Sequence, residues 1–219
     1  MLYEVIVNDW GETTYVPTTL GNLCLVLVIL ALLFGALFCA ARKTGKKLTV
    51  TQLTCCAAAI ALGTVLSNIK LFSFPTGGSI TLLSMLVICL PGYWFGLGAG
   101  IMTGVAYVIL QMLIDPYILF PAQLVIDYLL AFGALGLSGL FAGKKNGLIK
   151  GYVAGVLGRY FFSVLSGWIF FGMYAWEGWA PLPYSMVYNA IYLFSEGAVS
   201  ILILCLPPVK KSLQQIRNL

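Results

Sequence analysis

Long, unbroken apolar runs dominate the chain, and they restrict it to one broad class of protein. Seven runs follow one another, near residues 19–41, 51–70, 79–93, 96–114, 121–142, 150–173 and 185–206. A helix of about 20 apolar residues spans the hydrocarbon core of a bilayer. Only 9% of the residues are charged, against about 25% in a soluble domain. The sequence therefore predicts an all-α, polytopic membrane helical bundle. It excludes a membrane β-barrel, whose strands would alternate apolar and polar residues.

The residue types that commonly carry chemistry are scarce. The chain has no histidine, which is the commonest general base and metal ligand. Its six cysteines form no CxxC pair, and this favours buried free thiols over a metal or redox site. Gly143-Lys144 lacks the upstream glycine that a phosphate-binding P-loop requires. We therefore expect no enzyme, no metal and no cofactor, and any ATP-driven transport would need a separate ATPase.

Basic residues predict the orientation of the spans. Lysine and arginine gather at 42–47, 144–150 and 210–217. Seven spans place all three clusters on one side, and positively charged loops face the cytoplasm. We expect a multi-pass plasma-membrane protein with its N-terminus outside and its C-terminus inside. The predicted organisation is an extracellular arm at 1–18, an extra span with a basic loop at 19–50, a six-helix membrane domain at 51–206 and a basic cytoplasmic tail at 207–219.

Polar and aromatic side chains gather at one depth, in the outer third of the predicted bilayer. Asp127 lies about two turns into its span, where a charge without a partner costs about 2.5–3.5 kcal/mol. A carboxylate among phenol rings suits a cationic aromatic ligand, because the rings attract positive charge and the carboxylate balances it. The alternative is that Asp127 only joins helices through a buried hydrogen bond. The residues that share its depth are Gln123, Tyr128, Ser163, Ser166, Gly167, Tyr184, Tyr188, Asn189 and Tyr192.

The loops predicted on the same side are rich in aromatic residues, proline and glycine. Residues 74–79 read FPTGGS and residues 174–184 read YAWEGWAPLPY. This composition is typical of the aromatic belt at a membrane interface. It also fits a lid over an outward-facing ligand site.

Two further ionisable residues, Arg159 and Glu196, lie at matching depths in the last two spans. We predict that they form a structural ion pair. The alternative is a proton or ion relay of the kind found in secondary transporters.

Small residues recur at intervals of four in the second span, where Ala57 is followed by Ala61 and Ala59 by Gly63. Such spacing lets helices approach closely. It indicates either internal packing or docking to another membrane subunit.

Three stretches resemble a known family: GGSITLLSML at 77–86, PYILFPAQLVIDYLLAFGALGLSGLF at 116–141 and RYFFSVLSGWIFFGMYAWEGWAPLPYSMVYN at 159–189. In order, spacing and residue type they resemble the thiamine-specific substrate-binding (S) component of energy-coupling factor (ECF) transporters, the YuaJ-type family. The resemblance covers roughly residues 51–206. It implies a six-helix fold that binds thiamine near the outer face and associates with a membrane coupling protein and two ATPases.

The resemblance also implies a set of site residues. Ser163 stands where some members have a histidine, and Phe171 stands where a tryptophan stacks on the ligand. These changes reduce the stacking area and leave a thiamine precursor or analogue open as the ligand. The coupling protein is expected to contact Ala57 and Ala61. The ligand residues implied by the resemblance are Asp127, Tyr128, Tyr117, Tyr107, Ser163, Gly167, Phe171, Tyr184 and Asn189.

The sequence therefore predicts a membrane-embedded, high-affinity thiamine-binding subunit that depends on a separate ATPase module. The alternative is a solitary, proton-coupled secondary transporter of thiamine or a thiamine precursor. In that case Asp127, or the pair of Arg159 and Glu196, would titrate during the transport cycle.

Overall fold

The computed structural model of this chain describes residues 3–7, 13–21, 23–24, 27, 48–74, 77–114 and 121–217. The predicted extra span at 19–41 lies mostly outside the described residues, and Tyr117 lies outside them. Within the predicted N-terminal arm, strand β1 (Tyr3–Val7) pairs antiparallel with β2 (Thr13–Pro17).

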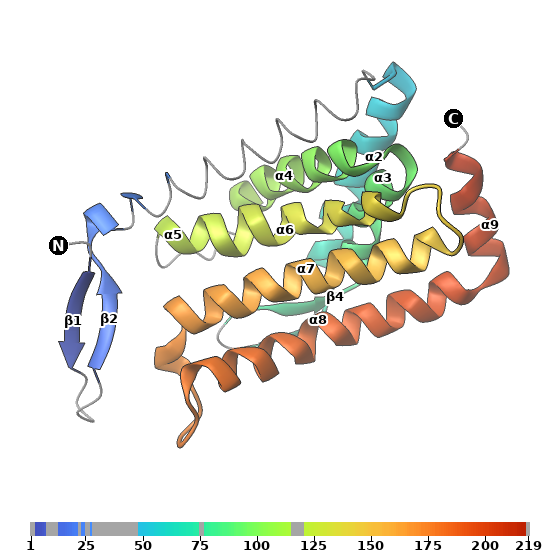
Figure 1. Cartoon of the computed structure of the whole chain (residues 1–219). Coiled ribbons are helices and arrows are strands. Elements are labelled where there is room, and N and C mark those ends of the chain that lie inside the picture. The colour runs from blue at the N-terminus through green and yellow to red at the C-terminus, as the bar shows by residue number, and fades with distance from the viewer. Residues whose placement is uncertain are drawn as a thin grey trace.

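Each of the six apolar stretches predicted after residue 50 contains a helical segment (Figure 1). Among the described residues, four segments are long and apolar enough to cross a membrane, and two others are shorter apolar helices. The predicted all-α, multi-pass bundle is therefore confirmed. In chain order the segments are α2 (Val50–Asn68), α3 (Ser84–Phe95), α4 (Leu97–Ile114), a composite segment over residues 121–141, α7 (Gly147–Phe170) and α8 (Pro181–Cys205).

Local signals in the sequence explain where several helices begin. α2 starts with a capping box, because the Thr49 hydroxyl accepts from the Gln52 N–H and the Gln52 side chain accepts from the Thr49 N–H, both at 3.2 Å. α8 starts at Pro181, whose fixed φ and missing N–H suit a first helical turn.

The third apolar stretch begins as a strand, and α3 starts only at Ser84 rather than at residue 79. Strand β4 (Ser79–Thr81) pairs antiparallel with β3 (Lys70–Ser73), and together they form the β3–β4 hairpin. A short apolar run does not reveal by its periodicity whether it is strand or helix. Gly77 and Gly78, in the turn of this hairpin, line a pocket.

α3 lies at the centre of the bundle, and every residue from Ser84 to Tyr93 is buried. It contacts α4 and the composite segment at backbone distance. A Cβ placed on Gly100 would lie 2.6 Å from the Cα of Gly92 and 2.8 Å from the Cα of Gly136. These glycines therefore allow the tight helix contacts that the sequence predicts.

The fifth stretch is not one regular α-helix. It consists of α5 (Pro121–Gln123), the π-helix η1 (Leu124–Leu130), α6 (Ala131–Gly133) and the 3₁₀-helix η2 (Ala134–Phe141). π-Helical turns are rare in proteins, and those that occur are often found at functional sites. The irregular geometry surrounds Asp127, which lies in the middle of η1.

The predicted basic tail is largely helical. Helix α9 (Pro207–Ile216) turns away from the axis of α8 at the C-terminal end of the bundle (Figure 1). The Trp94 indole N–H donates to the Leu213 carbonyl at 2.8 Å, and Leu213 packs against the main core. The tail is thus attached to α3.

Candidate functional site

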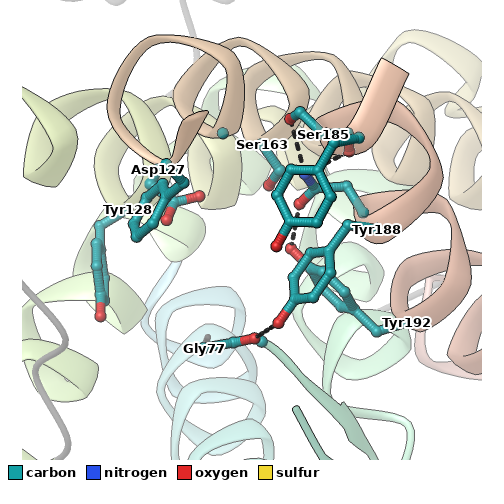
Figure 2. A pocket seen from close by; sticks show the side chains of 12 residues that line it. Gly77, Asp127, Tyr128, Ser163, Ser185, Tyr188 and Tyr192 are labelled. Carbon is teal, nitrogen blue, oxygen red and sulfur yellow. Dashed lines mark hydrogen bonds between the residues drawn. The ribbon is translucent and has the colours of Figure 1, made fainter. Parts of the chain in front are cut away.

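A pocket of about 540 Å³ lies between η1, the C-terminal half of α7, the N-terminal half of α8 and the turn of the β3–β4 hairpin. Figure 2 shows Asp127 on one side of this pocket and Tyr188 and Tyr192 on the other. The pocket is lined by Gly77, Gly78, Asp127, Tyr128, Ser163, Gly167, Phe171, Tyr184, Ser185, Tyr188, Asn189 and Tyr192.

The structure brings together most of the ligand residues that the sequence predicts, although they come from three separate segments of the chain. Tyr107 does not line the pocket, and Tyr117 lies outside the described residues. The role of the assembled residues in ligand binding stays a prediction. Those that line the pocket are Asp127, Tyr128, Ser163, Gly167, Phe171, Tyr184 and Asn189.

Tyr107 lines a larger adjoining cavity of about 1190 Å³. The two cavities share Asp127 and Tyr192, among other residues. The Tyr107 side chain is buried, and its hydroxyl accepts a hydrogen bond from Gln111 at 2.5 Å. Its ring packs against Phe132 with the centroids 5.4 Å apart. These contacts make Tyr107 part of the wall behind the pocket.

One face of α8 supplies a row of phenol rings. Tyr184, Tyr188 and Tyr192 are spaced by four residues, so they project from the same side of the helix. Their neighbouring ring centroids are 5.4 and 6.1 Å apart. The Tyr192 hydroxyl donates to the Asn189 side-chain oxygen at 2.6 Å, and the Asn189 amide nitrogen donates to the Ser185 carbonyl at 2.8 Å. The amide orientation is therefore fixed by its neighbours.

Five lining residues are missing from the predicted ligand set, and these are Gly77, Gly78, Ser185, Tyr188 and Tyr192. The spacing of the tyrosines did signal a common face of α8 at the depth of Asp127. Ser185 gave no such signal, because a serine inside an apolar helix is common and its partner is distant in sequence. Its hydroxyl donates to the Val164 carbonyl of α7 at 2.8 Å.

Gly167 lets α7 and α8 approach closely beside the pocket. A Cβ at this position would lie 3.1 Å from the Ser185 Cβ, 3.2 Å from the Asn189 amide nitrogen and even closer to the Ser185 hydroxyl. Any larger residue would displace these side chains. Gly167 therefore shapes the pocket wall through packing.

Asp127 brings a negative charge to the pocket, and it is the carboxylate among the described lining residues. The side chains of Gln123, one turn earlier, and Ser163 of α7 are its hydrogen-bonding neighbours. The positive charge of Arg159 also acts on this carboxylate, and both residues line the adjoining cavity. The Asp127 carboxylate faces the open volume of the pocket.

The turn of the β3–β4 hairpin forms one edge of the pocket and contacts the tyrosines of α8. The Tyr188 hydroxyl donates to the Gly77 carbonyl (Figure 2). Gly78 has a φ of +79°, and a Cβ there would lie 3.0 Å from the Tyr192 ring. Phe74 packs edge-on against Tyr188 at 5.4 Å. Position 78 therefore requires glycine, both for its backbone angle and because a side chain would meet the Tyr192 ring.

The loop between α7 and α8 packs against another edge. The rings of Trp176 and Trp179 meet edge-to-face at 5.1 Å, and Trp176 meets Tyr184 in the same way at 5.2 Å. Both indoles remain partly exposed. Trp176 therefore contacts a residue that lines the pocket.

Arg159 and Glu196, which the sequence predicts as an ion pair, have other partners in the structure. Glu196 is buried and accepts hydrogen bonds from Thr81, Ser84 and Met85 instead. The Arg159 guanidinium lies over the Phe132 ring, 3.9 Å from its centroid, in a cation–π contact. The two residues have matching predicted depths, but Glu196 is bound by residues 81–85 and Arg159 contacts Phe132.

The small residues of α2 divide between two faces. Ala59 and Gly63 are buried, and a Cβ on Gly63 would lie 2.7 Å from the Ile88 side chain of α3. Ala57 and Ala61 are exposed. Leu53, Leu62 and Val65 of α2 are exposed as well. The pair predicted to contact a partner subunit therefore lies on an apolar face that the described residues leave uncovered.

Comparison with known proteins identifies the family. A sequence model of the family described as "Thiamine transporter protein (Thia_YuaJ)" matches residues 53–216. This chain belongs to that family. The thiamine transporter ThiT of Bacillus subtilis (strain 168) is 36% identical over 148 residues, which cover 61% of this chain and 77% of the relative. A solved structure of ThiT from Listeria monocytogenes is similar, with a TM-score of 0.60 and 29% identity, and the match covers 72% of this chain and 96% of the other.

These findings confirm the predicted resemblance and the all-α membrane fold. The relatives are named as transporters and not as enzymes, which fits the expectation drawn from the missing histidine. The family match begins only at residue 53, so the predicted arm and extra span lie outside the matched region.

Proposed function

We propose that this chain is the thiamine-binding subunit of an ECF-type importer, which captures thiamine at the outer face of the plasma membrane. The observation that carries the proposal is the pocket of this thiamine transporter family member, where Asp127 faces a row of phenol rings. Thiamine is a cation with two aromatic rings. Phenol faces attract positive charge by about 0.5–2 kcal/mol per good contact, and a carboxylate strengthens hydrogen bonds from amino groups.

The proposed access to the pocket is from the outside, past two aromatic segments that flank it. One is the turn of the β3–β4 hairpin, which contacts Tyr188 and Tyr192. The other is the loop that carries Trp176 and Trp179. We propose that both close over bound thiamine and exclude water from it.

Release into the cell is proposed to need other subunits. The sequence contains no P-loop, so ATP hydrolysis would come from two separate ATPases that act through a membrane coupling protein. The exposed Ala57 and Ala61 on α2 are the proposed docking point, because small residues let a partner helix approach closely. The proposed topology has the arm at 1–18 outside, the extra span at 19–50 as an added anchor, and the tail at 207–219 in the cytoplasm.

The first test is a titration of the purified, detergent-solubilised protein with thiamine, followed by tryptophan fluorescence. We expect saturable quenching at submicromolar thiamine, because Trp176 contacts the pocket residue Tyr184. A folded protein that does not bind thiamine would refute the proposed ligand. Titrations with the separate pyrimidine and thiazole moieties would then test a precursor as the ligand.

A second test concerns energy coupling. The purified chain alone is reconstituted in liposomes, and thiamine uptake is measured under an imposed pH gradient. We expect no uptake without the coupling protein and ATPases. Uptake by the chain alone, driven by the gradient, would refute the subunit proposal in favour of a proton-coupled secondary transporter.

A further inference from the structure

The buried carboxylate of Glu196 joins α8 to the segment that links the β3–β4 hairpin to α3. Its side chain is only 3% exposed. One carboxylate oxygen accepts from the Met85 N–H at 2.9 Å and the Ser84 hydroxyl at 3.3 Å. The other accepts from the Thr81 hydroxyl at 2.6 Å and the Thr81 N–H at 3.3 Å. A single side chain thus receives four hydrogen bonds from the end of β4 and the first turn of α3.

The link between β4 and α3 lacks a cap of its own. The N-cap residue of α3 is Leu83, which has no side-chain acceptor and adopts left-handed backbone angles with a φ of 61°. This region is unfavourable for a leucine, and uncapped N–H groups in a first helical turn need an acceptor. Glu196 supplies that acceptor and also places a negative charge at the positive end of the helix dipole. It therefore stabilises a backbone conformation that the local sequence disfavours.

The same link positions the part of the hairpin that forms the pocket edge. Gly77 and Gly78 directly precede β4 and line the pocket. They contact Tyr188 and Tyr192, which lie eight and four residues before Glu196 on α8. Residues spaced by four lie on one helix face. One face of α8 therefore contacts the hairpin at two points. Tyr188 and Tyr192 contact its turn, and Glu196 contacts its base, which is the end of β4 at Thr81.

We infer that Glu196 is a positioning residue of the ligand site, which fixes the base of the hairpin and so determines how firmly the hairpin closes the pocket. This inference rests on the proposed function. Glu196 lines neither cavity, so it acts without touching the ligand. Its effect falls on the rate at which bound ligand leaves, whereas Asp127 provides the charge that recognises the ligand.

The test compares dissociation rates of thiamine, measured by stopped-flow displacement with tryptophan fluorescence. Glu196→Gln keeps the shape of the side chain but turns one acceptor oxygen into a donor that faces other donors. We expect dissociation to become about tenfold faster or more, with the association rate changed by less than about threefold. Thr81→Val removes one hydroxyl and should give a smaller change in the same direction. Ser195→Ala is the matched control, because its hydroxyl donates to the Ile191 carbonyl of its own helix.

A role in folding alone predicts a different result. Partial unfolding lowers the number of binding sites per protein, but it leaves the dissociation rate of the folded molecules unchanged. If Thr81 and Glu196 act through one contact, the double variant should release thiamine no faster than Glu196→Gln alone. A wild-type dissociation rate in Glu196→Gln that still binds thiamine would overturn the inference. If that variant does not fold, a wild-type rate in Thr81→Val overturns it.

Hydrogen exchange of the ligand-free protein gives a readout that does not depend on thiamine. Glu196→Gln should speed amide exchange in residues 77–86 and leave the other helices of the bundle unchanged. Unchanged exchange in this segment would overturn the inference even if thiamine binds. The opposite outcome is also informative. If the wild-type protein does not bind thiamine, but exchange in residues 77–86 is faster in Glu196→Gln than in wild type, the proposed function is refuted and the attachment of the hairpin by Glu196 is supported.

Discussion

Replacing Asp127 by asparagine tests the central feature of the proposed site, which is a carboxylate that balances the charge of a cationic ligand. Asparagine has nearly the same shape, so the π-helical turn η1 and the neighbours Gln123 and Ser163 are preserved. What is lost is the negative charge. A hydrogen bond to a charged group contributes about 1.5–3 kcal/mol, and about 1.4 kcal/mol corresponds to a tenfold change in affinity. We therefore expect thiamine to bind about tenfold to a hundredfold more weakly.

The assay is the fluorescence titration, performed on wild-type protein and on Asp127→Asn at the same ionic strength. The matched control is Glu4→Gln, which removes one carboxylate from an exposed position of strand β1 outside the pocket lining. A neutral analogue of thiamine, with the charged ring replaced by an uncharged ring of the same shape, completes the comparison. It should lose less affinity than thiamine when Asp127 is replaced, because it keeps its amino group but has no charge to balance.

Two results would refute this reasoning. Near-wild-type affinity of Asp127→Asn for thiamine would mean that the carboxylate does not face the ligand. An equal loss of affinity for thiamine and for the neutral analogue would mean that Asp127 does not balance the charge of the ligand.

Three further predictions concern packing and partner contacts. Phe171→Trp should tighten thiamine binding several-fold in the same titration, because a larger ring adds a stacking contribution of about 0.5–1.5 kcal/mol; unchanged or weaker binding would place this side chain away from the ligand. Gly167→Ala should lower the free energy of unfolding by about 1–3 kcal/mol, measured by thermal denaturation in detergent, because the new methyl group meets Ser185; unchanged stability and affinity would contradict the tight packing. Ala57→Leu together with Ala61→Leu should leave thiamine binding unchanged but abolish ATP-driven uptake by the reconstituted complex, and full uptake would exclude this face of α2 as the docking point.

The shared depth of polar residues was enough to place much of the candidate site. Asp127, Asn189 and Gly167 lie far apart in the sequence, yet each falls in the outer third of its span, and the structure gathers all three around one pocket. Depth is readable from sequence because an apolar helix has a fixed rise per residue and crosses the bilayer in a known direction. The resemblance then gave the same positions independently.

Depth does not reveal which helix face a residue occupies or which element comes between two helices. Arg159 and Glu196 match in depth, but the segment at residues 81–85 supplies the donors for Glu196 instead. That segment belongs to a predicted span whose first residues form β4. The π-helical geometry around Asp127 likewise leaves no trace in hydrophobic periodicity, because it changes the turn by one residue over a short stretch.

The charges inside the membrane domain also bear on the choice between a binding subunit and a proton relay. A relay needs ionisable groups that exchange protons with one another or with water. Glu196 is buried, receives four hydrogen bonds and lines neither cavity. Arg159 is held over the Phe132 ring. Of the two carboxylates in the described helices, only Asp127 faces open volume. Among the described residues, Asp127 is therefore the carboxylate that an entering cation can meet, and this supports the proposed binding site over a chain of titrating groups.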